Sequence, residues 1–189
     1  MAILKIARMG HPVLAEMCTS VRDPTAPEIR RLIADMIETM EDANGAGLAA
    51  PQVHAPLRLV VFQAPETRSA AGQDETEAFD HTAPLTILIN PVIEVLDATL
   101  EGGWEGCLSV PGLRGWVERP RHIRYSGLDA EGQRVQRSAR GFHARVVQHE
   151  CDHINGVLYP QRMRDLSKLI FESEYRHWID QNAARQAAQ

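Results

Sequence analysis

The chain has 189 residues, of which 44% are hydrophobic and 24% are charged, values that are typical of a soluble globular protein. Its formal net charge of −5 argues against nucleic acid (DNA included) or an anionic membrane surface as the main partner. No segment approaches the roughly 20 apolar residues that a membrane-spanning helix needs.

Chain length and cysteine content set two further expectations. A chain of this length, with no interdomain linker, predicts a single domain over residues 1–189. Cys18, Cys107 and Cys151 are odd in number and widely spaced, which favours a reducing compartment over a disulfide framework. Because the first residues resemble neither a secretory signal nor a transit peptide, we expect a cytoplasmic protein.

The first predicted element is a helix in TAPEIRRLIADMIETMEDANG, residues 25–45. Thr25 and Glu28 have the spacing of a capping box, and Pro27 lies in the first turn. Asn44-Gly45 is a stop signal. Apolar residues recur at helical spacing on one face, namely Ile29, Leu32, Ile33, Met36, Ile37 and Met40.

The next stretch, GAGLAAPQV at residues 45–53, fits the glycine spacing of a dinucleotide-binding loop. Such a loop follows a strand and opens a helix. Here the stretch follows a helix and precedes the β-like LRLVVFQ at residues 57–63, so its context rejects a nucleotide site.

The middle of the chain predicts strands and turns. Residues 64–82 are polar and acidic, and we expect an exposed loop. Residues 85–96 are strand-like, with a bend near Asn90-Pro91. Segments 116–129 and 133–139 can pair as a hairpin around the turn residues Asp129 to Gly132.

Two helices are predicted in the last third of the chain. One spans about 139–154 and is ended by Asn155-Gly156, and the other spans about 165–182 and continues into a frayed tail to residue 189. The order of elements predicts an α+β fold, with antiparallel or mixed β-sheets packed around the helix at 139–154.

That helix carries the motif H-E-x-x-H at His149, Glu150 and His153. Residues four apart on a helix lie one above the other, so both imidazoles can reach one metal ion. Glu150 is rotated by about 100° from His149, which suits a general base beside the metal. Phe142 and Val146 continue the histidine face as an apolar stripe.

A catalytic metal needs a third protein ligand, and two candidates stand out. Glu172 or Glu174, downstream in FESEYRH, would suit a zinc endopeptidase. Cys107, upstream in EGCLSVPG, would supply a thiolate from a strand-to-loop junction.

Three segments, GAGLAAPQ, EGCLS and QHECDH, closely resemble the three signature motifs of peptide deformylases, in the same order and spacing. Each motif is complete, and the resemblance covers about residues 3–165. The loops around GLRGWVERP and GFHARVVQHECDH look more like the mitochondrial and plant subclass and its bacterial relatives. The resemblance implies an enzyme that removes the formyl group from N-formylmethionyl nascent polypeptides, with residues 1–189 as one catalytic domain.

The resemblance also implies residue roles. Cys107, His149 and His153 would bind one divalent metal, natively Fe(II), with Zn, Ni or Co able to replace it. Glu150 would be the general base and acid. Gln52 and the backbone N–H of Leu108 would bind the oxyanion.

Substrate and supporting residues follow from the same reading. Phe142 and Val146 would form one wall of a pocket for the methionine side chain, with Ala46 and Gly47 forming another. The family places a charged pair where Glu105 and Arg119 stand, which would hold the Cys107 loop. The substrates would be nascent chains met near the ribosome exit.

Two rival readings stay open at the level of the sequence. One is the zinc endopeptidase with His149, His153 and Glu172 or Glu174 as ligands. The other is a non-enzymatic fold with a structural metal, which would give Glu150 no use.

Overall fold

The computed structural model describes residues 2–65 and 81–187, so most of the expected acidic loop at 64–82 lies outside the described residues. The helices and strands, in chain order, are α1 (Pro27–Asp42), β1 (Gly47–Ala49), β2 (Leu59–Ala64), β3 (Ala83–Cys107), β4 (Val110–Leu128), β5 (Arg134–Arg140), α3 (Gly141–His153), β6 (Leu169–Phe171) and α4 (Tyr175–Ala187).

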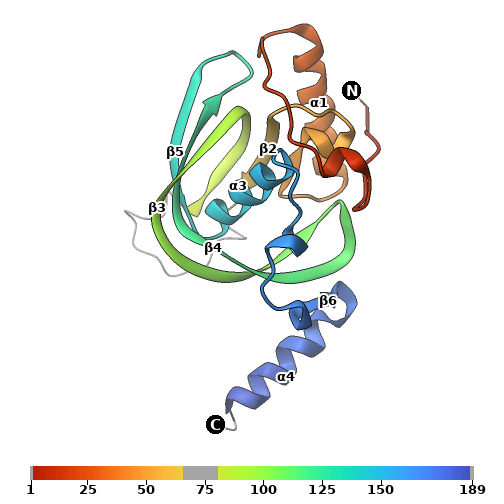
Figure 1. The fold of residues 1–189 in the computed structure, drawn as a ribbon, viewed down its shortest axis with the longest axis vertical. Coiled ribbons are helices and arrows are strands. Elements are labelled where there is room, and N and C mark those ends of the chain that lie inside the picture. Colours follow the sequence, from red (N-terminus) through yellow and green to blue (C-terminus); the bar gives the residue numbers. More distant parts are fainter. Residues whose placement is uncertain (1, 66–80, 188–189) are drawn as a thin grey trace.

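The strands of the described residues form one six-stranded sheet, in the order β1-β2-β3-β4-β5 with β6 paired to β4. Every pairing between these strands is antiparallel. The long strands β3 and β4 curve around α3, which lies in the hollow of the sheet (Figure 1). Together with its helices, this sheet confirms the predicted α+β fold.

The curvature of the sheet has identifiable causes in β3. Its register to β4 shifts between Ile89 and Val92 and twice more before Leu100, and such irregularities bend a strand. The first shift coincides with the predicted bend at Asn90-Pro91, where Asn90 has φ 53°. The Asn90 side chain bonds the backbone N–H and C=O of Val21, which holds this unusual conformation.

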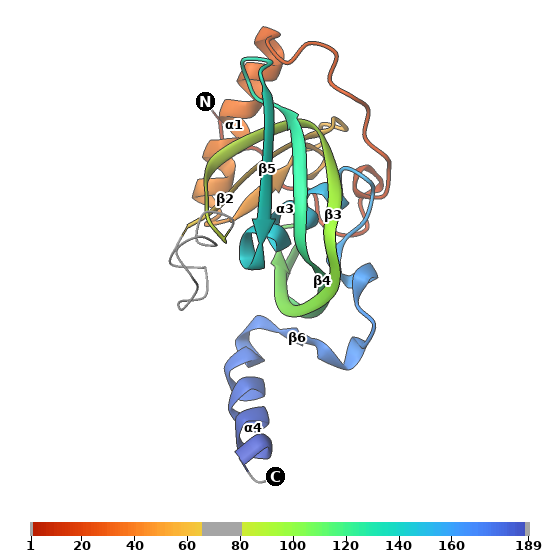
Figure 2. The same cartoon turned by 90° about the vertical axis from the view of Figure 1, so that its left-hand side faces the viewer.

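Because side chains alternate along a strand, β2 has one hydrophobic layer on each of its two faces. Val60 and Phe62 pack in the cluster that includes α3, whereas Leu59 and Val61 pack in the cluster that includes α1. Figure 2 shows α1 on the opposite side of the sheet from α3. The motif helix is therefore a buried central element, fixed by packing along its length.

The start of α1 differs from the prediction. Ala26 is the N-cap, and its methyl group cannot cap the helix. Thr25 lies one residue earlier and donates its hydroxyl and N–H to Asp23. The expected capping box of Thr25 and Glu28 is therefore wrong. The helix still begins at Pro27, whose fixed φ suits a first helical residue.

The C-terminal helix also differs. Residues 165–174, predicted as helix, contain short 3₁₀ turns and strand β6, and α4 begins only at Tyr175. β6 pairs with the edge of β4, with Leu113 opposite Phe171 and Gly115 opposite Leu169. Pairing to an available strand edge has overridden the local helical pattern.

Candidate metal centre

The structure brings Cys107, His149 and His153 together. Cys107 is the last residue of β3, and the two histidines lie one turn apart on α3. One ligand atom from each lies within 4.8 Å of the other two, and the Cys107 Sγ is 3.3 Å from Nε2 of His153. Within residues 2–65 and 81–187 this is the one group of three such residues.

The donor set fits a metal ion. Zn–S and Zn–N bonds of about 2.0–2.3 Å, at tetrahedral angles, place ligand atoms about 3.6 Å apart. The ligand atoms of the cluster, all within 4.8 Å of one another, lie near this spacing. Thiolate with two imidazoles suits soft and borderline divalent cations such as Zn²⁺ and Fe²⁺.

Glu150 lies beside this cluster as a buried carboxyl group. Its Oε2 has no hydrogen-bond partner among the described residues, and burial raises the pKa of Glu150 to about 7. The backbone of Gly47 lies directly against it, since a Cβ on Gly47 would collide with the Glu150 carboxylate. Such an unpaired carboxyl group is costly to bury, which is typical of a group with a chemical task.

Gln52 is held in one orientation. In the 3₁₀ turn Ala50–Val53, its Oε1 accepts from the N–H of Ala49 at 2.8 Å. Its Nε2 therefore faces the opposite way, donating to Ser109 Oγ at 3.1 Å and to Cys107 Sγ at 3.6 Å. Ser109 is a site neighbour that sequence reasoning missed.

A cleft of about 780 Å³ opens onto the cluster. All four residues predicted to form the methionine pocket line it, namely Ala46, Gly47, Phe142 and Val146. Gln52, Leu108, Cys107, His149 and Glu150 line it as well. The structure thus gathers residues from all three sequence motifs around one cavity, next to an apolar wall.

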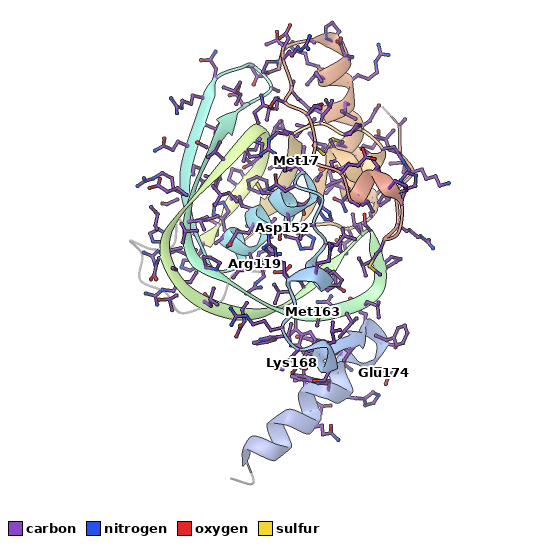
Figure 3. All side chains as sticks on the ribbon, in the orientation of Figure 1. Met17, Arg119, Asp152, Met163, Lys168 and Glu174 are labelled. Atoms are coloured by element: carbon purple, nitrogen blue, oxygen red, sulfur yellow. The ribbon has the colours of Figure 1, made fainter. Side chains whose placement is uncertain are left out.

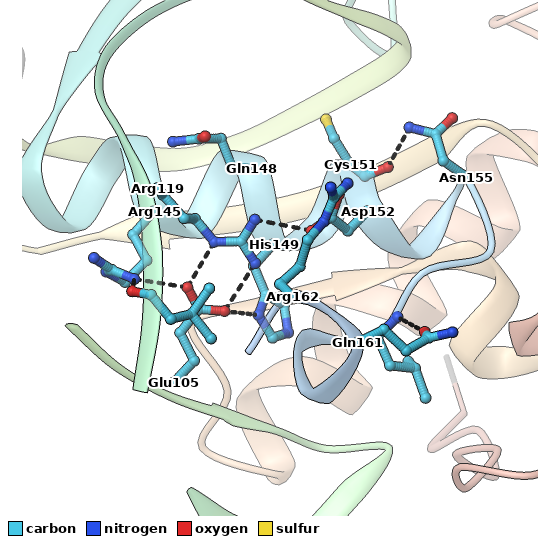
Figure 4. Close-up of polar contacts among 12 residues, drawn as sticks. Glu105, Arg119, Arg145, Gln148, His149, Cys151, Asp152, Asn155, Gln161 and Arg162 are labelled. Atoms are coloured by element: carbon cyan, nitrogen blue, oxygen red, sulfur yellow. Dashed lines mark hydrogen bonds and ion pairs between the residues drawn. The ribbon is translucent and has the colours of Figure 1, made fainter. Parts of the chain in front are cut away.

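The predicted pair of Glu105 and Arg119 is present as a buried ion pair, with Nε and Nη2 on the two carboxylate oxygens at 2.6 and 2.9 Å (Figure 4). Glu105 Oε2 also lies 2.9 Å from Nδ1 of His149. Although burial opposes it, hydrogen bonding to Arg119 and His149 holds the pKa of Glu105 well below its usual range. A charged Glu105 fixes the His149 ring with Nδ1 as donor and leaves Nε2 for a metal.

The ion pair extends to Asp152 of α3, which is not among the residues that line the cleft. Asp152 accepts from Arg119 at 2.8 Å and from Arg162 at 2.6 Å (Figure 4). Arg119 is thus bound between two carboxylates and joins β4 to both β3 and α3. Such connected networks fix side-chain positions better than isolated pairs.

Arg145 is another residue that sequence reasoning missed. It donates to Glu105 Oε1 and to the carbonyl groups of Val117 and Glu101, each at 2.8 Å. It stands four residues before His149 and therefore on the same side of the helix, a spacing that could have indicated it.

The two acidic residues considered as alternative ligands lie elsewhere. Glu172 Oε1 accepts from Nε and Nη2 of Arg114 at 2.9 and 2.6 Å, and Glu174 accepts from Ser173. Neither joins the group that Cys107 forms with the histidines. Figure 3 shows Glu174 on the C-terminal segment, away from Arg119 and Asp152.

An H-E-x-x-H helix with a cysteine sulfur beside the two imidazoles is typical of a metal-dependent hydrolase. Comparison with known proteins narrows this class. The family model of polypeptide deformylase matches residues 3–169, and the chain therefore belongs to the polypeptide deformylase family.

Individual peptide deformylases are similar to this chain in sequence and in structure. Peptide deformylase 2 of Bordetella bronchiseptica is 52% identical over 180 residues, covering 94% of this chain and 97% of that protein. The structure is similar to that of peptide deformylase from Ehrlichia chaffeensis, with TM-score 0.79 and 32% identity over 88% of this chain and 90% of that one. It is also similar to a class I type b peptide deformylase from Acinetobacter baumannii bound to Met-Ala-Ser, with TM-score 0.73 and 32% identity. That match covers 85% of this chain and 98% of the other one.

Membership in this family defines the activity. The protein is a hydrolase that removes the N-formyl group from nascent polypeptides, and the family implies a divalent metal. Among the described residues, no helix combines the length and the apolar character of a membrane-spanning segment.

Proposed function

We propose that Cys107, His149 and His153 hold the divalent metal of this deformylase. The observation that carries the proposal is their convergence within 4.8 Å beside the unpaired carboxyl group of Glu150. A bound divalent cation supplies Lewis acidity and lowers the pKa of a water molecule toward neutrality. We propose Fe(II) as the native ion, with Zn, Ni or Co able to replace it.

Glu150 moves the proton in this proposal. Its carboxylate accepts a proton from the water that attacks the formyl carbon, and the C–N bond then breaks. Glu150 returns the proton to the leaving amine, so formate and a free N-terminus are released. Burial and the absence of a hydrogen-bond partner at Oε2 support this role, because they favour a carboxyl group that exchanges protons near neutral pH.

The oxyanion that forms on the formyl oxygen needs hydrogen-bond donors already in place. We assign this task to Nε2 of Gln52 and the backbone N–H of Leu108. The orientation of Gln52 supports the assignment, because its bond with Ala49 turns the donor Nε2 toward Cys107 at the cleft.

The methionine side chain occupies the apolar wall formed by Phe142 and Val146, with Ala46 and Gly47 opposite. The peptide backbone pairs with exposed backbone near Gly47 and residues 103–105, as in the addition of a strand. β1 is an edge strand of the sheet, which supports this mode of binding. The relative solved with Met-Ala-Ser supports a cleft that takes the peptide beyond methionine.

The cellular setting is proposed from the substrate. Nascent chains carry the formyl group as they leave the ribosome, so we propose that the enzyme works near the ribosome exit, in the cytoplasm. The three free cysteines are consistent with a reducing compartment. The subclass resemblance and a single catalytic domain over residues 1–189 stay predictions.

Ligand substitutions test the metal assignment against the endopeptidase alternative. Cys107→Ala should lose bound metal and formate release together, whereas Glu172→Ala should keep its metal. Metal content by elemental analysis and formate release from formyl-Met-Ala-Ser provide the two readings. Metal retained in Cys107→Ala but lost in Glu172→Ala would overturn the assignment.

A purely structural metal makes a different prediction for Glu150. A closed site would leave activity independent of the carboxylate next to it. Unchanged formate release by Glu150→Ala with normal metal content would therefore exclude catalysis by Glu150.

A further inference from the structure

Part of the cleft wall comes from outside the three sequence motifs. Arg114 of β4 and Glu172, between β6 and α4, both line the cavity that opens onto the metal centre. Glu172 is close to Arg114 only because β6 pairs with β4, where Arg114 is opposite Ile170. The C-terminal segment therefore forms one side of the substrate cleft.

Aromatic packing fixes this segment in place. Trp104 of β3 makes edge-to-face contacts with Trp116 of β4 and with Tyr175 and Trp178 of α4. The Arg114 guanidinium also lies 5.3 Å from the centre of the Tyr175 ring. Trp104 also lines the cleft, so one side chain both forms part of the cleft wall and contacts α4.

Arg114 and Glu172 form a close ion pair on this wall. Nε and Nη2 of Arg114 both donate to the same Glu172 oxygen, at 2.9 and 2.6 Å. The side chains keep 36% and 56% of their exposure, so the pair faces solvent at the cleft rather than the protein interior. Each charge is neutralised by the other, and removal of one would leave an unbalanced charge beside the substrate.

We propose that the Arg114–Glu172 pair sets the charge preference for the substrate residues that follow formylmethionine. The inference rests on the proposed function, because the formylmethionyl end must occupy the buried part of the cleft at Glu150. The residues that follow must then leave toward solvent, past the exposed part of the wall. With both charges present the cleft tolerates acidic and basic residues, and Glu172 prevents Arg114 from favouring acidic ones.

Two charged peptides and three variants test this proposal. Formate release is measured with formyl-Met-Glu-Glu amide and formyl-Met-Lys-Lys amide, and the ratio of their kcat/KM values is compared. Glu172→Gln should raise the acidic-to-basic ratio about threefold or more, and Arg114→Gln should lower it by a similar factor, as expected for one partly screened charge. The double variant should return the ratio close to that of the unsubstituted protein.

Glu118→Gln is the matched control. Glu118 lies on β4, as Arg114 does, and pairs with Arg164 at 3.0 Å, but it does not line the cleft. Its substitution changes the net charge by the same amount as Glu172→Gln. This control should keep the original ratio, and 0.5 M KCl should weaken the effect at Glu172 and Arg114.

The outcomes separate this proposal from the one on which it rests. Three results would overturn the charge-preference proposal while leaving deformylase activity intact. The ratio could stay constant, it could move in the same direction in both single variants, or Glu118→Gln could change it as much as Glu172→Gln does. Failure of the unsubstituted protein to release formate from either peptide would instead overturn the proposed function, and this inference with it.

Discussion

Gly47 is the residue at which the backbone of the cleft comes closest to the proposed general base. Because its missing Cβ leaves the space that the Glu150 carboxyl group occupies, no larger residue fits there without moving Glu150. The second glycine of GAGLAAPQ, Gly47, therefore lets the backbone lie close to a carboxyl group rather than to a phosphate. The sequence context rejected the nucleotide reading, but only packing identifies which atoms the glycine accommodates.

Gly47→Ala should consequently lose activity while keeping its metal. A displacement of about 1 Å at a reacting group can cost roughly a hundredfold in rate, and we expect a loss of kcat of that order. Steady-state formate release, with metal content measured on the same sample, checks this. Full kcat in Gly47→Ala would show that the position of Glu150 is not limited by this contact.

The three cysteines should differ in reactivity. Burial raises the pKa of Cys18 to about 11 and that of Cys151 to about 12, so at pH 8 about one thousandth or less of either would be thiolate. Cys107 is half-buried and lines the cleft. Iodoacetamide should therefore modify Cys107 first in the metal-free protein, and bound metal should protect it.

Mass spectrometry of the cysteine peptides over time provides the measurement. Equal labelling of Cys107 with and without metal would contradict its assignment as a ligand. Rapid labelling of Cys151 in the folded protein would contradict its placement in the core.

At the scale of elements, the site depends on how α3 is joined to the strands around it. Arg145 binds Glu105 and two backbone carbonyl groups of β3 and β4, and only 12% of its side chain is exposed. It holds the helix that carries both histidines against the strand that ends in Cys107. Arg119 makes a second such connection through Glu105 and Asp152.

Arg145→Met should destabilise the metal-free protein by about 2–4 kcal/mol, because it removes buried charge-assisted bonds and leaves carbonyl groups unpaired. Urea unfolding gives the value. Arg124→Met is the matched control, since Arg124 pairs with Glu94 at an exposed site and should cost no more than about 1 kcal/mol. Equal effects of the two substitutions would show that Arg145 is not a structural connection.

The elements also show what can be read from sequence and what cannot. Periodicity and turn residues predicted α1, β2, the β4–β5 hairpin and α3, because local spacing determines these elements. Cys107 could be joined to His149 and His153 only through the motif resemblance, because spacing alone left Glu172 and Glu174 open. β6, and with it the position of Glu172 on the cleft, depends on pairing with a strand more than 50 residues away, which no local pattern encodes.

At the scale of the whole molecule, the proposed metal centre would join the sheet to the helix inside it. Cys107 comes from the sheet and the histidines from the helix inside it, so a bound ion connects layers that otherwise meet through packing and the Glu105 network. Binding of an ion to the folded state alone must raise stability.

Removal of the metal should therefore lower the melting temperature. An ion at 1,000 times its dissociation constant would contribute about 4 kcal/mol. Calorimetry before and after chelation measures the difference, with His153→Ala as the control that should not respond to the chelator. An unchanged melting temperature after complete loss of metal would contradict a site shared by sheet and helix.

Formate release from formyl-Met-Ala-Ser tests the central claim most directly. The protein is loaded with Fe(II) under anaerobic conditions, because the proposed Fe(II)–thiolate site would be sensitive to oxygen. The unsubstituted protein should release formate, and Glu150→Gln with the same iron content should be slower by about 10²–10⁴ in kcat. No formate from the iron-loaded protein, or equal rates for the two proteins, would contradict the assignment of Glu150 and the metal centre beside it.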